Sequence, residues 1–254
     1  MADPTRRFSN RVQNYLKYRP RYPLAIIALL ESECGLTSES VIAEPGSGTG
    51  LLTELFLENG NQVFGIEPNA EMRAAGERLL ASYPKFSSIN ATAEATTLPN
   101  QSVDLIVAGQ AFHWFDREST GREFSRILKP AGWVVLIWNG FSVESSPLMS
   151  AYQKLLLRHG TDYLEVSREL DHSDIASFFA PGSCRLAHFK FQQVFDYEGL
   201  EGRLLSSSFV PEPNHPNYEL MRRDLRDIFN AHQKDGRVAF AYKTEVYYGQ
   251  LSAG

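Results

Sequence analysis

The stretch VIAEPGSGTG, residues 41–50, decides the fold of the amino-terminal half of the chain. Its apolar start predicts a short buried strand, and its glycines predict a tight loop that opens into a helix. Because glycine has no Cβ atom, the loop backbone can adopt positive φ angles and approach a ligand closely, while the new helix offers unpaired N–H groups. A loop of this kind holds a nucleotide-like ligand.

The acid at the end of the predicted strand, Glu44, restricts which charged groups the ligand can carry. Glu44 would repel a pyrophosphate, but it suits a ligand with an ammonium group, such as the methionine part of S-adenosylmethionine. The loop has the pattern GxGxG followed by Leu51, whereas dinucleotide-binding loops have GxGxxG or GxGxxA. Both observations favour a methyl donor over a dinucleotide.

Strand-like and helix-like runs alternate around this loop. A helix that starts at Pro23 and continues until Gly35 precedes it. The other predicted elements of this half are strand 41–43, helix 51–58, strand 62–66, helix 70–81, strand 86–90, strand 103–108, helix 117–128, a turn at 129–132 and strand 133–138. Such alternation indicates parallel βαβ units and hence a doubly wound α/β sheet.

The pattern changes after residue 139, where helices become more frequent. The predicted elements there are helices 147–159 and 173–179, strand 185–195, helices 200–206 and 218–232, and strand 237–248. We expect a Rossmann-like, doubly wound, mostly parallel seven-stranded sheet with an antiparallel last strand and a helical cap over the ligand crevice. Residues 1–35 would form a lid and first helix, residues 36–140 the ligand-binding core, and residues 141–254 the cap insertions with the last two strands.

Composition and charge exclude several classes of protein. Among the 254 residues, 43% are hydrophobic and 22% are charged, which is ordinary for a folded globular chain. The formal net charge of −5 argues against a nucleic-acid-binding protein. The apolar runs are too short for a membrane span, and no apolar stretch follows the basic residues at the start, so we expect a cytoplasmic protein. Cys34 and Cys184 stand in no metal-binding or redox spacing, and no metal is expected.

The first 22 residues are a local exception to the acidic charge. They carry six basic residues against Asp3 alone, with three tyrosines between them. The residues concerned are Arg6, Arg7, Arg11, Tyr15, Lys17, Tyr18, Arg19, Arg21 and Tyr22. A solvated helix face and a surface that grips an anionic ligand are both consistent with this pattern.

A second acid, Glu67, ends the second predicted strand. In open α/β sheets, ligands lie beyond the carboxyl ends of the strands, and an acid at the second strand accepts hydrogen bonds from a ribose diol. Dinucleotide-dependent enzymes use the same kind of acid. Glu67 therefore predicts a ribose-containing ligand without distinguishing a methyl donor from a dinucleotide.

Four motifs together resemble the class I S-adenosylmethionine-dependent methyltransferases, specifically their type 11 small-molecule group, over residues 8–139. They are EPGSGTG at 44–50, IEPN at 66–69, ATAEATTLPNQSVDLI at 91–106 and LKPAGWVVLIW at 128–138. The segment FSNRVQNYLKYRP at 8–20 is similar to the lid of that group, including trans-aconitate methyltransferase-like proteins that act on small carboxylic acids. Pro45 departs from the usual motif.

This resemblance implies a role for each motif residue. Glu44 would face the ammonium group of S-adenosylmethionine, directly or through water, and Glu67 would hold its ribose. Gln110 would lie between donor and acceptor. The other residues implied to bind the cofactor are Tyr15, Arg19, Gly46, Ser47, Gly48, Gly50, Pro68, Asn69, Ala93 and Glu94.

His113 follows the fourth predicted strand, on the side where a methyl acceptor should lie. It is the candidate general base, and a packed, hydrogen-bonded histidine is the alternative. Trp114 and Phe115 are expected to form the pocket wall or to pack in the core. Asp104, at the start of the same strand, is expected to organise a turn rather than to touch the ligand.

The resemblance implies an enzyme that methylates a small, anionic acceptor, by in-line transfer to a carboxylate or hydroxyl oxygen. The tyrosines and arginines of residues 15–22 would form a lid that closes over the donor and helps recognise the acceptor. A nicotinamide-dependent oxidoreductase is an alternative, disfavoured by the GxGxG loop and by Glu44. A catalytically silent S-adenosylmethionine-binding protein is another.

Overall fold

The computed structural model describes residues 12–166 and 172–251 and contains one seven-stranded sheet. Its strands are β1 (Val41–Pro45), β2 (Gln62–Ile66), β3 (Phe86–Ile89), β4 (Val103–Gly109), β5 (Leu128–Phe141), β6 (Cys184–Phe195) and β7 (Val238–Gly249). The first part of the predicted lid, residues 8–11, lies outside the described residues, and so do the basic residues Arg6 and Arg7 that precede it. Only the later part of the lid can therefore be placed.

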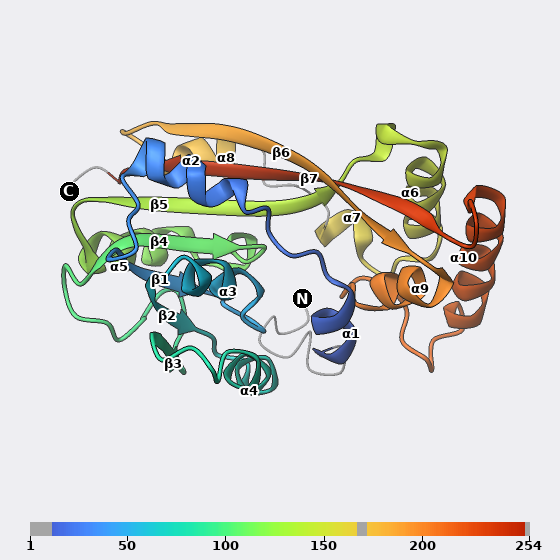
Figure 1. Ribbon diagram of the computed structural model, residues 1–254, viewed down its shortest axis with the longest axis horizontal. Helices are drawn as coiled ribbons and strands as arrows, with labels where there is room; N and C mark the ends of the chain where they lie inside the picture. Colours follow the sequence, from blue (N-terminus) through green and yellow to red (C-terminus); the bar gives the residue numbers. More distant parts are fainter. Residues whose placement is uncertain (1–11, 167–171, 252–254) are drawn as a thin grey trace.

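The sheet has the strand order β3-β2-β1-β4-β5-β7-β6 (Figure 1). Strands β1 to β5 run parallel, and β7 runs antiparallel to both β5 and β6. This arrangement confirms the predicted mostly parallel sheet with an antiparallel last strand. Strand β4 is buried along nearly its whole length, because a parallel sheet is covered on both faces.

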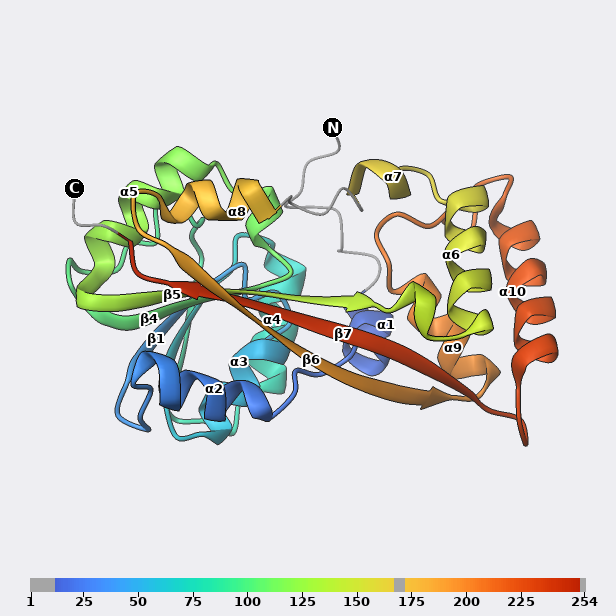
Figure 2. The same cartoon turned by 90° about the horizontal axis from the view of Figure 1, so that it is seen from above.

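Helices flank the sheet and also extend beyond its core. They are α1 (Val12–Tyr18), α2 (Ala25–Cys34), α3 (Leu51–Glu58), α4 (Ala70–Leu79), α5 (Arg117–Ile127), α6 (Pro147–His159), α7 (Tyr163–Val166), α8 (His172–Phe179), α9 (Tyr197–Leu205) and α10 (Tyr218–His232), with the short 3-10 turns η2 (Phe112–Trp114) and η3 (Val143–Ser145). Helices α2 and α3 pack on one face, while α5 and α8 pack on the other (Figure 2). Each helix pair buries its own apolar cluster against the strands.

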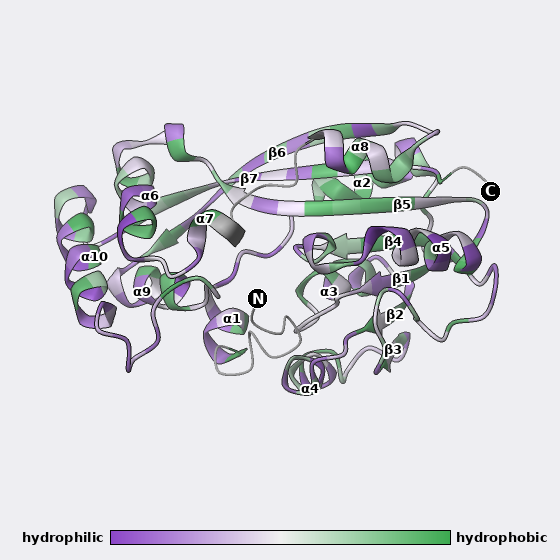
Figure 3. Cartoon of the chain, turned by 180° about the vertical axis from the view of Figure 1, so that it is seen from behind, coloured by the Kyte–Doolittle hydropathy of each residue, from purple (hydrophilic) through white to green (hydrophobic). Residues whose placement is uncertain are grey.

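Strands β5, β6 and β7 extend beyond this core and carry a second group of helices at their far ends (Figure 2). We call α6, α7, α9, α10 and these strand ends the cap. The cap has a separate apolar cluster that includes Tyr152, Leu204 and Phe240. Where β5 leaves the core, it changes from hydrophobic to hydrophilic (Figure 3). The predicted division at residues 35 and 140 stays a prediction.

Helix α1 bridges the core and the cap. Val12 packs against Met72 of α4, whereas the Tyr18 hydroxyl donates a hydrogen bond to Glu198 of α9 at 3.0 Å. A Cβ atom on Gly202 of α9 would overlap the Tyr18 ring, so only glycine allows this close approach. Helix α1 thereby closes one side of the space between core and cap.

The basic residues near α1 divide between two roles that the sequence left open. Lys17 forms an exposed ion pair with Glu198, and Arg21 pairs with Glu54 of α3. Arg19 instead lines the space between core and cap. The charge pattern of this segment therefore combines surface ion pairs with one cation that faces inward.

Strand β5 differs from its predicted bounds. It starts at Leu128, and the predicted turn at 129–132 is an irregular part of the strand in which Ala131 has a φ of 63°. The pairing with β4 shifts register across this segment. Asp104 accepts hydrogen bonds from the Val41 amide at 2.8 Å and from Lys129 at 2.9 Å, which agrees with its expected structural role.

Helices α1 and α7 were not predicted, because both are short and neither has a complete amphipathic period. The remaining predicted elements are present with boundaries shifted by at most a few residues. Within residues 12–166 and 172–251, no helix combines the length and the apolar character that a membrane span requires.

Candidate functional site

A cavity of about 790 Å³ lies between the carboxyl ends of the core strands and the cap. This volume is within the range of small-molecule sites. Its core side includes the glycine loop, Glu67, Gln110 and His113, and its cap side includes residues of α6, α9 and β7. A smaller pocket beneath the glycine loop is lined by Glu44 and Ser47. The cavity therefore joins the predicted donor residues to the cap.

The glycine loop is held by the end of β2. The amides of Gly46 and Ser47 both donate to the Ile66 carbonyl, at 2.8 and 3.2 Å. Gly46 has a φ of 71° and Gly48 a φ of 57°, in the left-handed region that favours glycine. The backbone itself, without side chains, therefore forms this wall of the cavity.

Replacing Gly46 by alanine is expected to lower the free energy of unfolding far more than the same change at Gly35. Both residues have positive φ angles, of 71° and 68°, so both variants carry a similar backbone cost. A Cβ on Gly46 would also lie 2.5 Å from Ala111 Cβ, whereas a Cβ on Gly35 meets nothing within 4 Å. Overpacking of this kind costs about 1–3 kcal/mol. Urea denaturation of both variants measures the difference, and equal losses would contradict the packing role of Gly46.

Glu67 is held rigidly at the end of β2. One carboxylate oxygen accepts the Gly48 amide at 2.9 Å, and the other accepts the Asn69 amide at 2.8 Å. The residue is 8% exposed and lines the cavity. Burial raises the pKa of Glu67, while the hydrogen bonds from Asn69 and Gly48 oppose this shift. The carboxylate is thus oriented before a ligand arrives, with further lone pairs available to it.

Glu44 is the most deeply buried acid of the site, at 1% exposure. Its carboxylate accepts a hydrogen bond from the Thr53 hydroxyl at 2.5 Å. Burial raises the pKa of Glu44 to about 8, and the charge of Glu67 adds to this shift. In the described part of the chain, no basic side chain pairs with Glu44. A cationic group entering the small pocket would favour its ionised form.

Pro68 and Ala93 line the cavity, and we call this part of its wall the slot. Asn69 caps α4, since its side-chain oxygen accepts the Met72 amide at 2.9 Å. Glu94 is half-buried and accepts the Asp116 amide at 3.0 Å, which ties this slot to the start of α5. The slot therefore has a defined shape.

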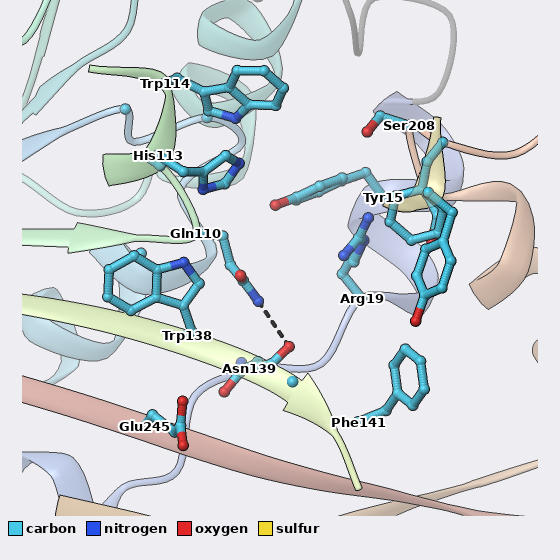
Figure 4. Close-up of a pocket in the computed structure, with 18 of the residues that line it drawn as sticks. Tyr15, Arg19, Gln110, His113, Trp114, Trp138, Asn139, Phe141, Ser208 and Glu245 are labelled. Carbon is cyan, nitrogen blue, oxygen red and sulfur yellow. Dashed lines mark hydrogen bonds between the residues drawn. The ribbon is translucent and has the colours of Figure 1, made fainter. Parts of the chain in front are cut away.

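Gln110 and His113 lie on the wall between the donor side and the cap (Figure 4). Gln110 has a φ of 59°, unusual for a residue with a side chain, and its amide nitrogen donates to the Asn139 carbonyl at 2.9 Å. The His113 ring stands beside Trp114, with ring centroids 4.6 Å apart. Tyr15 and Arg19 face them across the cavity (Figure 4).

Nearly all residues predicted from the motifs lie on the wall of the cavity or of the small pocket. Those on a wall are Tyr15, Arg19, Glu44, Gly46, Ser47, Gly48, Glu67, Pro68, Asn69, Ala93, Glu94, Gln110 and His113. Gly50 is on neither wall. A Cβ there would lie 2.7 Å from Leu80 Cδ1, so Gly50 allows the start of α3 to pack against α4.

Several polar residues of the cap line the cavity without having been singled out from the sequence. They are Tyr152, Arg203, Ser207, Ser208, Lys243 and Glu245. They come from α6, the end of α9 and β7, and no local motif links them. Only the folded arrangement of the cap brings them together.

The chain is similar to known methyltransferases. Residues 43–136 match the family described as a methyltransferase domain. An uncharacterised methyltransferase-like protein of Schizosaccharomyces pombe is 26% identical over 94% of this chain and 93% of its own length. An uncharacterised methyltransferase of the same yeast is 34% identical over 53% of each chain. A third, from Mycobacterium tuberculosis, is 33% identical over 52% of this chain. The chain spans about half the length of these last two relatives.

Solved structures share the fold. A candidate type II methyltransferase from Anaeromyxobacter dehalogenans superposes with a TM-score of 0.70 at 20% identity, covering 93% of this chain and 100% of that one. A candidate methyltransferase of an antibiotic biosynthesis pathway from Anabaena variabilis has a TM-score of 0.62 at 19% identity, covering 92% and 99%.

The strand order and the glycine loop define a Rossmann-like fold. With the domain match and the methyltransferase relatives, the chain is an S-adenosylmethionine-dependent methyltransferase, and S-adenosylmethionine is its cofactor. The residues present fit this cofactor. Gly46 and Gly48 bring bare backbone to the cavity wall, and among the described residues no cation pairs with the buried Glu44, so a methionine ammonium could do so.

Proposed function

We propose that the protein transfers a methyl group from S-adenosylmethionine to an oxygen atom of a small anionic acceptor, a carboxylate or a hydroxyl. The observation that carries this proposal is the continuous cavity, which runs from the glycine loop past Arg19 into the cap. Its volume suits two small molecules better than a macromolecule. In this proposal, residues 1–35 form the lid, residues 36–140 hold the donor and residues 141–254 choose the acceptor.

On the donor side, we assign Glu67 to the ribose and Glu44 to the methionine ammonium. The carboxylate of Glu67 is already oriented by two backbone amides, so it can accept ribose hydroxyls without rearrangement. The slot lined by Pro68 and Ala93 would take the adenine. Arg19 and Tyr15 would close over the donor from α1 and the residue that follows it.

When bound, S-adenosylmethionine supplies an electrophilic methyl group on a positively charged sulfur. The C–S bond breaks as the new C–O bond forms, and the electron pair of the C–S bond stays on sulfur. The chain has to align the acceptor oxygen with this bond and exclude water, and such positioning supplies much of the rate acceleration. A carboxylate is already ionised at neutral pH and needs no base, whereas a hydroxyl must lose its proton.

The role of His113 follows from this difference. With a carboxylate acceptor, His113→Gln is expected to change kcat less than about threefold and to leave the pH–rate profile without a new inflection, because no proton is removed. If a hydroxyl is methylated, the kcat of the same variant should fall roughly 10²–10⁴-fold. The part of the pH–rate profile that is caused by ionisation of His113 should then also disappear. Initial rates between about pH 6 and 9 measure both quantities.

A screen of small acids and hydroxy compounds tests the proposed reaction. The chain and S-adenosylmethionine are incubated with each compound, and products are read by mass spectrometry for the gain of one methyl group. Alkaline hydrolysis of the product separates methyl esters from methyl ethers, and reactions without acceptor are the control. Methylation only at nitrogen, carbon or sulfur would overturn the proposal, and stabilisation by NADH but not by S-adenosylhomocysteine would favour an oxidoreductase.

A further inference from the structure

Two arginine side chains meet at the cap side of the cavity, and neither has a carboxylate partner within the described residues. Arg203 of α9 is 5% exposed, and its guanidinium donates to the Tyr242 hydroxyl at 2.9 Å and to the Ser207 hydroxyl at 3.2 Å. Arg19 donates to the Ser206 carbonyl at 3.1 Å. All of these acceptors are neutral, and the guanidinium groups also lie over the rings of Tyr15, Phe240 and Tyr242, so among the described residues no negative charge balances either arginine.

The charges oppose each other inside the protein. Burial and the nearby charge of Arg203 lower the pKa of Arg19 to about 10. Glu245, which also lines the cavity, is already paired with Lys243 at 2.7 Å and is not a spare carboxylate for the arginines. Burying unpaired charge is costly, and proteins offset this cost with a counter-ion. A bound anion would provide one here.

Unpartnered polar atoms point to the same place. Among the described residues, neither the buried Tyr152 hydroxyl nor Nε of Arg19 has a hydrogen-bond partner. Tyr152 is 1% exposed, and both residues line the cavity. Burial raises the pKa of Tyr152 to about 12, so its hydroxyl keeps its proton and can donate it in a hydrogen bond. Buried polar groups without partners are rare in folded proteins, and a ligand that pairs with them accounts for these two.

We propose that Arg203, Tyr152 and Ser207, bordered by Arg19, form an anion-binding subsite for a non-reacting carboxylate of the methyl acceptor. The acceptor is then a small molecule with a second acidic group, remote from the oxygen that is methylated. A carboxylate held by guanidinium groups has its lone pairs engaged and is a poor nucleophile, so the anchored group differs from the reacting one. That the bound anion belongs to a methyl acceptor rests on the proposed function. That these residues bind an anion does not.

Binding of simple diacids tests the subsite without requiring turnover. Succinate, glutarate and adipate are titrated into the chain saturated with S-adenosylhomocysteine, each against its monomethyl ester, which lacks one charge. We expect at least one diacid to bind roughly tenfold or more tightly than its monoester, as hydrogen bonds to charged groups allow. If no diacid binds better than its monoester, the subsite is refuted.

Two variants assign the binding to the named residues. Tyr152→Phe removes only the unpartnered hydroxyl and should fold normally, while Arg203→Met removes the charge at similar length. Each should weaken diacid binding about tenfold or more and bring it toward the monoester value. Arg158→Met is the matched control, because Arg158 lies on α6 like Tyr152 but pairs with Asp224 outside the cavity. Unchanged diacid binding in Tyr152→Phe and Arg203→Met would overturn the assignment.

Two further measurements separate the alternatives. The affinity for S-adenosylhomocysteine should be the same in all four proteins, since an equal loss there would mean that the subsite holds the carboxylate of the donor. Tighter binding of 4-phosphonobutyrate than of glutarate would show that a phosphoryl group, rather than a carboxylate, is the preferred anion. A chain that binds diacids but methylates no oxygen would contradict the proposed function and leave the subsite intact.

Discussion

Replacing Glu67 by alanine is expected to weaken binding of S-adenosylhomocysteine by roughly 10²–10³-fold, because two hydrogen bonds from the ribose to a charged acceptor are lost together. The carboxylate is held by the Gly48 and Asn69 amides, so its loss also leaves both amides without their acceptor and loosens the glycine loop. Isothermal titration of the purified variant measures the affinity. With saturating acceptor, methyl transfer at low donor concentration should fall by a similar factor.

The controls for Glu67 separate ligand binding from folding. Glu71→Ala removes an exposed acid four residues further along the chain and should bind S-adenosylhomocysteine like the unmodified protein. Glu67→Gln keeps the shape of the side chain and one carbonyl oxygen. Its affinity for S-adenosylhomocysteine should lie between that of Glu67→Ala and that of the unmodified protein. If Glu67→Ala stays folded by circular dichroism and retains affinity within about threefold, then Glu67 does not hold the ribose, since even one hydrogen bond to a charged group is worth more.

Replacing Glu44 by glutamine is expected to remove a pH dependence of both stability and donor binding. The pKa of Glu44 is raised to about 8 in the folded chain, from an ordinary value of 4.5. Below pH 4.5 the group is protonated in the folded and the unfolded chain alike. As the pH rises above 4.5, the Glu44 carboxyl ionises in the unfolded chain before it does so in the folded chain. The free energy of unfolding therefore falls with pH up to about pH 8. Glu44→Gln should therefore be more stable than the unmodified protein at pH 8 and above, by a few kcal/mol.

Donor binding should show the opposite trend, because a methionine ammonium favours the ionised carboxylate. The affinity of the unmodified protein for S-adenosylhomocysteine is expected to rise by up to tenfold per pH unit toward about pH 8, with release of a proton on binding. In Glu44→Gln the affinity should be lower and nearly independent of pH over this range. Calorimetry in buffers of different ionisation enthalpy measures the released proton.

The control for Glu44 lies on the next helix. Glu58→Gln changes an exposed acid of α3 and should reproduce the pH dependence of the unmodified protein. Binding that is equally pH-dependent in Glu44→Gln would show that another group faces the ammonium. Thermal unfolding of the three proteins without ligand, between about pH 5 and 9, measures how the stability depends on pH.

The core side of the cavity was predictable because its residues lie in short motifs at the ends of strands. Glu44 lies near the end of β1 and the glycine loop follows this strand, while Glu67 follows β2 and Gln110 follows β4. In a parallel sheet these strand ends lie at one edge, so a local pattern becomes a spatial cluster without further information. Gly50 is the exception, since its packing against Leu80 depends on how α3 and α4 meet.

The cap side of the cavity could not be derived in the same way. Tyr152 and Arg203 lie on helices far apart in the sequence, and a lone tyrosine or arginine in an amphipathic helix carries no signal of its own. They meet because β5, β6 and β7 extend beyond the core and carry α6 and α9 to the mouth of the cavity. Arg19 joins them only because Gly202 lets α1 pack against α9.

By itself, the sequence determined that the chain forms a doubly wound sheet with a methyl-donor loop at residues 41–50. Strand periodicity and the backbone freedom of glycine act over a few residues, so they can be deduced without a structure. The tertiary structure alone decided that, among the described residues, two guanidinium groups without carboxylate partners and a tyrosine hydroxyl without a hydrogen-bond partner line the cap side of the cavity. Burial and charge balance depend on which distant residues become neighbours, and only the packing of cap, lid and core sets that.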